Sequence, residues 1–205
     1  MRLGNTRQTY GAISIALHWL VALLVLGLFP LGLYMTSLDY YHPWYQAAPH
    51  LHRGLGITLL LLLSLRLCWR FISPPPRPLD GGSRLLRRLA GLVHGGLYLL
   101  LFAIAVSGYL ISTADGRGIE VFGWFTVPAL LPAFKDMEDA AGDIHFVLAV
   151  SLIGLVALHG LAALKHHFID RDPTLMRMLG RPRRVTGRAT GAITESETFF
   201  TKETS

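Results

Sequence analysis

The sequence predicts an all-α fold, a transmembrane four-helix bundle with both termini in the cytoplasm. Of its 205 residues, 52% are hydrophobic and only 16% are charged, a composition typical of integral membrane proteins. The apolar residues form four runs long enough to span a bilayer, for which about 20 residues suffice. These runs cover residues 13–34, 51–72, 89–111 and 144–168. Basic residues gather at the N-terminus, after the second run and in the C-terminal segment, which orients these parts toward the cytoplasm.

The first two runs each carry a histidine close to one end. His18 lies one to two turns inside the cytoplasmic end of the first run. Arg2 and Arg7 precede this run as in a signal peptide, but its length, its histidine and the lack of a small-residue cleavage site predict a retained span. His52 opens the second run on the periplasmic side, and this run ends before three consecutive prolines, which cannot continue a helix.

The third run has His94 near its cytoplasmic start, and the fourth carries His145 and His159. Residues 115–143 form the longest external segment between them, and their glycines and prolines predict a short amphipathic piece that re-enters the membrane interface. We expect residues 1–182 to form one membrane domain. Residues 183–205, first basic and then polar, are expected to be a disordered tail.

Depth predicts how the histidines pair. His18 and His159 both lie near the cytoplasmic face, whereas His52 and His145 both lie in the first turn at the periplasmic face. Intramembrane histidines are costly and are therefore interpreted as functional. Two imidazoles without a thiolate or carboxylate provide too few ligands for a tetrahedral zinc site. They suit bis-imidazole ligation of a haem iron. Two such levels predict two haem groups, with no catalytic side chain assigned.

A spacing of fourteen residues, which returns to nearly the same helix face about 21 Å further along, recurs in all four runs. The pairs are His18 with Gly32, His52 with Arg66, His94 with Gly108, and His145 with His159. Gly32, Gly108 and Gly56 can let a macrocycle approach the backbone, or they serve helix packing. Arg66 at the cytoplasmic level and Arg53 at the periplasmic level can hold haem propionates. Arg66 can alternatively snorkel to the headgroups.

Other polar residues have less specific interpretations. His94 is either a propionate contact, a quinone contact or a histidine of the core. Lys165 and His166, together with Arg66, are candidates for a quinone site near the cytoplasmic face. Cys68 is the only cysteine, so the chain has neither an intramolecular disulfide nor a motif for covalent haem attachment.

Several stretches resemble the prokaryotic cytochrome b561 family over residues 8–182. They are SIALHWL in the first run, LHRGLGI and RLCWR in the second, LAGLVH in the third, and IH followed by LVALHGLAALKHHF in the fourth. The resemblance implies an inner-membrane protein with two non-covalent haem b groups that passes electrons between a periplasmic partner and the quinone pool. It implies His18 and His159 as ligands of the cytoplasmic haem, and His52 and His145 as ligands of the periplasmic haem.

Three alternatives stay open. The first is a superoxide:ubiquinone oxidoreductase, an activity known in this family. The second is an anchor subunit of a hydrogenase- or formate dehydrogenase-like complex, and the third is a haem-free proton pathway or metal transporter. The external segments carry more acidic than basic residues, which disfavours steering of anionic superoxide unless Arg53 and Arg117 form a local positive funnel. Such a face suits a basic redox protein.

The partners expected from the sequence are the lipid bilayer, a quinone and a periplasmic donor, and a homodimer is compatible with it. The net charge of +6 is explained by a basic cytoplasmic face against anionic headgroups. No nucleic-acid partner is therefore expected.

Overall fold

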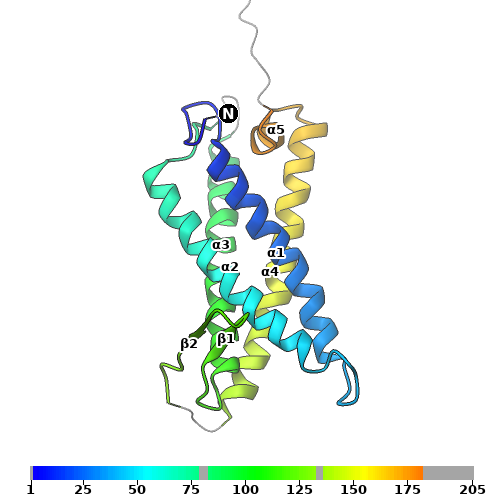
Figure 1. Ribbon diagram of the computed structural model, residues 1–205. Helices are drawn as coiled ribbons and strands as arrows, with labels where there is room; N and C mark the ends of the chain where they lie inside the picture. Colours follow the sequence, from blue (N-terminus) through cyan, green and yellow to red (C-terminus); the bar gives the residue numbers. More distant parts are fainter. Residues whose placement is uncertain (1, 79–82, 133–135, 182–205) are drawn as a thin grey trace, which may run out of the picture.

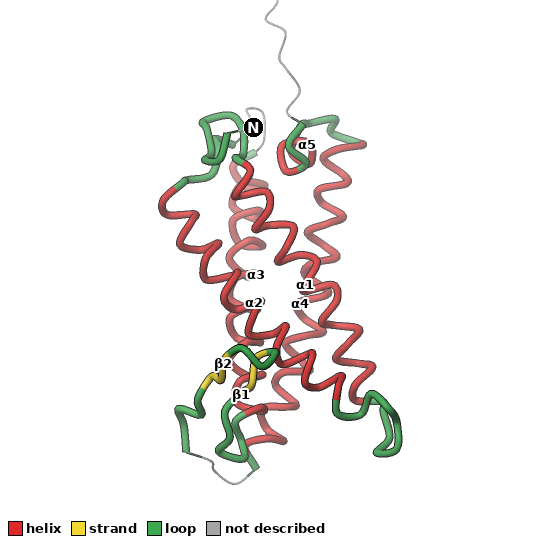
Figure 2. Tube along the Cα trace, in the orientation of Figure 1, coloured by secondary structure: helices red, strands yellow, loops and turns green. Residues whose placement is uncertain are grey.

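The computed structural model describes residues 2–78, 83–132 and 136–181. Four long helices dominate this part of the chain: α1 (Ala12–Thr36), α2 (Ala47–Ile72), α3 (Arg84–Ser112) and α4 (Met137–Phe168). Each is long and apolar enough to cross a membrane. The predicted four-helix transmembrane fold is thus confirmed (Figure 1, Figure 2). The tail predicted for residues 183–205 lies outside the described residues.

The helices are longer than the apolar runs, because polar residues extend their ends. The Ser83 hydroxyl oxygen accepts a hydrogen bond from the Leu86 backbone N–H at 3.1 Å, which caps α3. The first turn of α4 holds Glu138 and Asp139, whereas its last turn is basic. This order of charge complements the helix dipole, so α4 begins seven residues before the apolar run.

The bundle consists of two helical hairpins, because α1 packs mainly along α2 and α3 mainly along α4. A layer of buried aliphatic side chains from all four helices joins the two hairpins. It comprises Val21, Val25, Leu28, Leu59, Leu63, Leu101 and Leu152. On every helix these residues lie between the two positions that are fourteen residues apart, so apolar packing separates two polar levels.

The two ends of the bundle differ (Figure 1). The N-terminal segment, the α2–α3 connection and the short helix α5 (Thr174–Met178) lie at one end. There the indole N–H of Trp19 donates to the Met178 carbonyl at 2.9 Å. The α1–α2 loop and a small hairpin lie at the other end. The beginning and the end of the described chain are therefore on the same side of the bundle.

The external segment at residues 115–143 contains a β-hairpin. Strand β1 (Ile119–Val121) pairs antiparallel with β2 (Phe125–Val127), and the re-entry of this segment into the membrane interface stays a prediction. Burial alternates along β1, with Ile119 and Val121 only 3% and 2% exposed, which is the period of a strand. The β-hairpin packs against α2.

Candidate metal centres

The inner level, which lies toward α5, brings together side chains from all four long helices. The ring centroids of His18 and His159 are 6.4 Å apart, with an interplanar angle of 76°. His94 of α3 approaches His159 to 5.2 Å between centroids. The Arg66 guanidinium of α2 donates to His18 Nδ1 at 2.8 Å and to the Tyr98 hydroxyl at 3.0 Å. The predicted pairing of His18 with His159 is thus present as a contact.

The outer level, which lies toward the β-hairpin, holds the second predicted pair. The ring centroids of His52 and His145 are 6.3 Å apart. The Ser107 hydroxyl donates to the Ile104 carbonyl at 3.0 Å and lies 3.0 Å from His145 Nδ1. Because the single hydroxyl proton is used on Ile104, Nδ1–H of His145 is the donor and its Nε2 keeps a free lone pair. His52 Nδ1 is buried and has no hydrogen-bond partner.

Two of the three predicted glycines lie against these rings. A Cβ at Gly32 would be 3.2 Å from Cε1 of His52, and one at Gly108 would be 3.1 Å from Cε1 of His145. A Cβ at Gly56 would meet nothing within 4 Å. Each member of the fourteen-residue pairs therefore lies at its predicted level, with Gly32 and Gly108 making room for a histidine ring.

The residues fit two bis-imidazole haem sites. Metal–imidazole bonds are about 2 Å long, so a metal between two rings puts their centroids about 6 Å apart. Both histidine pairs have this separation. The unpartnered His52 nitrogen and the free Nε2 of His145 are donor atoms that an iron can use. Each pair also joins one helical hairpin to the other.

The hydrogen bond from Arg66 determines which ring nitrogen of His18 carries the proton. A guanidinium only donates hydrogen bonds, so Nδ1 of His18 accepts and the neutral ring carries its proton on Nε2. Ligation of a metal through Nε2 therefore requires Arg66 to release this bond. The released guanidinium would still lie at the inner level, where it can pair with an acid group.

Arg53 lies apart from the outer histidine pair. Its Nε donates to the Pro49 carbonyl at 3.3 Å, and its side chain borders an open hollow of about 770 Å³ that Tyr45 and His50 also line. Arg117 is paired with Asp115, whose carboxylate accepts from Arg117 Nε at 2.7 Å. The hydrogen bond from the Arg117 backbone N–H and then the one from its side chain lower the pKa of the Asp115 carboxyl. The positive charge of Arg117 is therefore largely compensated at the outer end.

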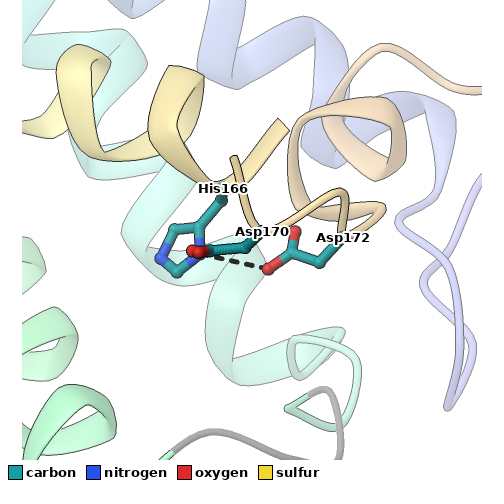
Figure 3. Close-up of side chains that lie close together, drawn as sticks. All are labelled: His166, Asp170 and Asp172. Carbon is teal, nitrogen blue, oxygen red and sulfur yellow. Dashed lines mark ion pairs between the residues drawn. The ribbon is translucent and has the colours of Figure 1, made fainter. Parts of the chain in front are cut away.

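Lys165 and His166 lie in the last turn of α4, and Figure 3 shows His166 beside Asp170 and Asp172. Lys165 Nζ donates to both carboxylate oxygens of Asp170, at 2.9 and 2.8 Å. His166 Nδ1 lies 2.8 Å from Asp170 and 3.1 Å from Asp172. The hydrogen bond from Lys165 holds the pKa of the Asp170 carboxyl below its ordinary value. One imidazole and two carboxylates are suitable ligands for a divalent cation. Both carboxylate oxygens of Asp170, however, already accept hydrogen bonds from Lys165.

Two polar residues of the site escaped the sequence analysis. Tyr98 holds Arg66 and Ser107 holds His145. Both lie on α3, whose apolar run was interpreted only through His94 and Gly108. A signal for Tyr98 was available, since it lies four residues after His94 and therefore on the same helix face. Ser107 is the neighbour of Gly108 and had no comparable signal.

Comparisons with known proteins agree with this arrangement. A family model described as prokaryotic cytochrome b561 matches residues 9–181. Cytochrome b561 homolog 2 of Escherichia coli (strain K12) is 55% identical over 181 residues, which cover 88% of this chain and 96% of that protein. A probable superoxide oxidase, CybB, of Yersinia pestis is 31% identical over 177 residues, covering 86% and 98%. Cytochrome b562 of Cereibacter sphaeroides is 30% identical over 178 residues, covering 85% and 96%.

Proposed function

The chain belongs to the prokaryotic cytochrome b561 family, and from that premise we propose that it binds two haem b groups and carries electrons between a periplasmic redox partner and the quinone pool. Family membership makes it a multi-pass inner-membrane cytochrome of electron transport, and implies haem b. Haem supplies reversible one-electron chemistry at its iron. The number of haems, their ligands and the quinone are the parts that we propose.

The observation that carries this proposal is the pair of imidazole contacts at two levels. His18 with His159 would hold the inner haem, and His52 with His145 the outer one; both pairs have centroid separations near 6 Å. Every ligand pair bridges the two helical hairpins. The apolar layer between the levels excludes water and ions from the path between the two irons.

We assign Arg66 to a propionate of the inner haem. Its hydrogen bond to His18 Nδ1 must break before His18 can ligate through Nε2, and a nearby carboxylate is the natural new partner of a guanidinium. Tyr98 would keep Arg66 at this level, because its hydroxyl accepts from Nε of the same guanidinium. We propose the corresponding role for Arg53 at the outer haem, for which its guanidinium would have to leave the Pro49 carbonyl.

The quinone is proposed to bind near the inner end of α4. Quinone reduction consumes protons, and His166 with its neighbours Asp170 and Asp172 is a cluster of titratable groups at that end. Lys165 adds a positive charge that can stabilise a reduced quinone oxygen. In this proposal electrons enter at the outer level and leave at the inner one.

The test is haem content measured by the pyridine haemochrome assay, with reduced-minus-oxidised spectra of the purified protein. Two b haems per chain are expected. His159→Ala should lose one haem and keep the outer one, since His52 and His145 are unchanged. A wild-type protein without haem, or a His159→Ala variant that keeps both haems or loses both, would contradict the proposal.

A second candidate is a superoxide:quinone oxidoreductase, which is favoured by the similarity to the probable superoxide oxidase of Yersinia pestis. An anion is drawn to positive potential, but the pairing of Arg117 with Asp115 leaves Arg53 as the main candidate to attract it. Stopped-flow mixing with superoxide separates the two functions. Haem reduction faster than spontaneous dismutation, and its loss in Arg53→Gln, would favour the oxidase.

A further inference from the structure

We propose that His94 is a positioning residue for the inner haem: its Nε2 accepts a hydrogen bond from Nδ1–H of His159 and thereby orients that ligand. The inference rests on the proposed function, in which His159 binds the inner iron through Nε2. His94 itself binds no iron in this arrangement. It acts through His159, from a different helix of the same hairpin.

The protonation of His94 follows from its own hydrogen bond. Its Nδ1 lies 2.7 Å from the Ala90 carbonyl oxygen. A carbonyl oxygen only accepts, so Nδ1 of His94 carries the proton and donates. In a neutral imidazole the other nitrogen is then an acceptor. Nε2 of His94 therefore keeps a lone pair, and the bond to Ala90 holds the ring in one tautomer.

The distances separate the two histidines that neighbour His159. An N–H···N bond of about 3 Å between two imidazoles puts their centroids about 5 Å apart, and His94 lies 5.2 Å from His159. His18 lies farther away, at 6.4 Å, the separation expected of two rings on opposite sides of a metal. The centroid separation of His94 and His159 is thus the one that such a hydrogen bond needs, whereas His18 and His159 have the separation of a ligand pair.

At the outer level, the α4 histidine already donates a hydrogen bond to a residue of α3. There Nδ1–H of His145 donates to the Ser107 hydroxyl of α3. His94 and Ser107 both belong to α3, which packs along α4. Helix α3 would therefore supply a hydrogen-bond acceptor to each of the two α4 histidines while supplying no ligand itself.

Such an acceptor changes the electronic properties of a ligand. A ligating histidine that donates its second N–H is fixed in orientation and becomes more basic. A more basic imidazole stabilises ferric over ferrous iron, so it lowers the midpoint potential of the haem. Loss of the His94 acceptor should therefore raise the potential of the inner haem and leave that of the outer haem unchanged.

The experiment compares His94→Leu, which lacks the acceptor, with His94→Gln, which keeps one, by spectroelectrochemical titration of the purified two-haem protein. The inner haem is identified as the one that remains in His145→Ala. His94→Leu should change its oxidised-to-reduced ratio at fixed potential by about tenfold, which is 59 mV for one electron. His94→Gln should restore most of the shift. Ser107→Ala should raise the potential of the outer haem instead.

Three results would overturn the inference: an unchanged inner potential in His94→Leu, an equal shift of both haems, or no difference between the leucine and glutamine variants. If His94→Leu does not assemble, His94→Phe keeps a planar ring without the acceptor and takes its place. Failure of the proposed function is recognised separately, because the wild type or His159→Ala would then have the wrong number of haems before any potential is measured.

Discussion

Two glycines decide how closely the outer histidines approach neighbouring helices. Gly32 of α1 faces the ring of His52, and Gly108 of α3 faces the ring of His145, with 3.2 and 3.1 Å from a hypothetical Cβ to the ring. At this separation a methyl group touches the imidazole, so a larger side chain must displace it. In the proposed two-haem protein these glycines would act on the outer haem site through packing alone.

We predict that Gly108→Val weakens outer haem binding by about ten- to a hundredfold, since inserting methyl groups into a packed site costs about 1–3 kcal/mol. The haem content should fall toward one per chain, as measured by pyridine haemochrome after dilution. Gly91→Val, on the same helix but with nothing within 4 Å of its Cβ, is the matched control and should keep two haems. Equal haem loss in both variants would mean that helix propensity, not the contact with His145, is responsible.

The ion pairs of Asp170 give a pH prediction for the inner end. Lys165 donates to this carboxylate, which lowers its pKa from an ordinary value of 3.8. A lowered pKa in the folded state means that the carboxylate contributes stability above its unfolded pKa. The contribution is lost as the pH falls through the lowered value. The ion pair with Lys165 is therefore intact throughout the neutral range.

Carbon-13 NMR titration of the Asp170 carboxyl carbon in detergent checks this prediction. Its midpoint should lie below 3.8, and Lys165→Met should move it upward, because the first cause of the lowered pKa is the hydrogen bond from Lys165. Arg177→Met, a change of one positive charge on the neighbouring helix α5, should leave the midpoint in place. An unchanged midpoint in Lys165→Met would show that another group carries the shift.

At the residue scale, the sequence predicted which histidines lie together wherever depth along a helix was enough. Hydropathy locates the spans and the fourteen-residue spacing fixes the level, so His18, His52, His145 and His159 could be paired before any coordinates. Hydrogen-bond partners depend on how helices rotate against one another, which hydropathy does not reveal. The partners Tyr98 and Ser107, and the bond between Arg66 and His18, therefore required the structure.

At the scale of elements, the sequence predicted the four long helices but not the two strands of the external segment. Long apolar runs leave no alternative to a helix in a bilayer, whereas β1 is three residues long and its alternation is too short to identify in the sequence. The β-hairpin packs against α2, and its turn comes close to Gly54. A Cβ at Gly54 would lie 2.7 Å from the Phe122 ring, and Phe122 itself has a φ of 52° at the turn.

We predict that Gly54→Ala lowers the free energy of unfolding by about 1–3 kcal/mol through this clash, against the gain of about 1 kcal/mol that alanine brings to a helix interior. The measurement is thermal unfolding in detergent, within a double-mutant cycle. Phe122→Ala removes the ring, so the double variant should be more stable than the sum of the single changes predicts. Additive effects would show that the hairpin does not rest on Gly54.

At the scale of the whole molecule, two helical hairpins meet through an apolar layer with a polar level on either side. This symmetry makes orientation decisive, because it determines which level faces the periplasmic donor and which faces the cytoplasm. The beginning and end of the described chain lie on one side of the bundle. Arg2, Arg7, Arg77 and Arg177 lie at that same end, whereas Arg117 at the other end is paired with Asp115. The arginine distribution predicts that the inner level is cytoplasmic.

Reporter fusions in a bacterial inner membrane test this orientation. Green fluorescent protein attached after Ser205 should fluoresce, and alkaline phosphatase at the same site should be inactive, because the phosphatase needs periplasmic disulfide formation. Alkaline phosphatase inserted at Leu130, an external position that is 75% exposed, should be active. A fusion at Tyr41 in the α1–α2 loop is the matched control and should behave like Leu130, because this loop and the β-hairpin lie at the same end of the bundle. Active phosphatase at the C-terminus would show that the orientation is the opposite of the predicted one. His18 and His159 would then face the periplasm, and the proposed direction of electron flow would reverse.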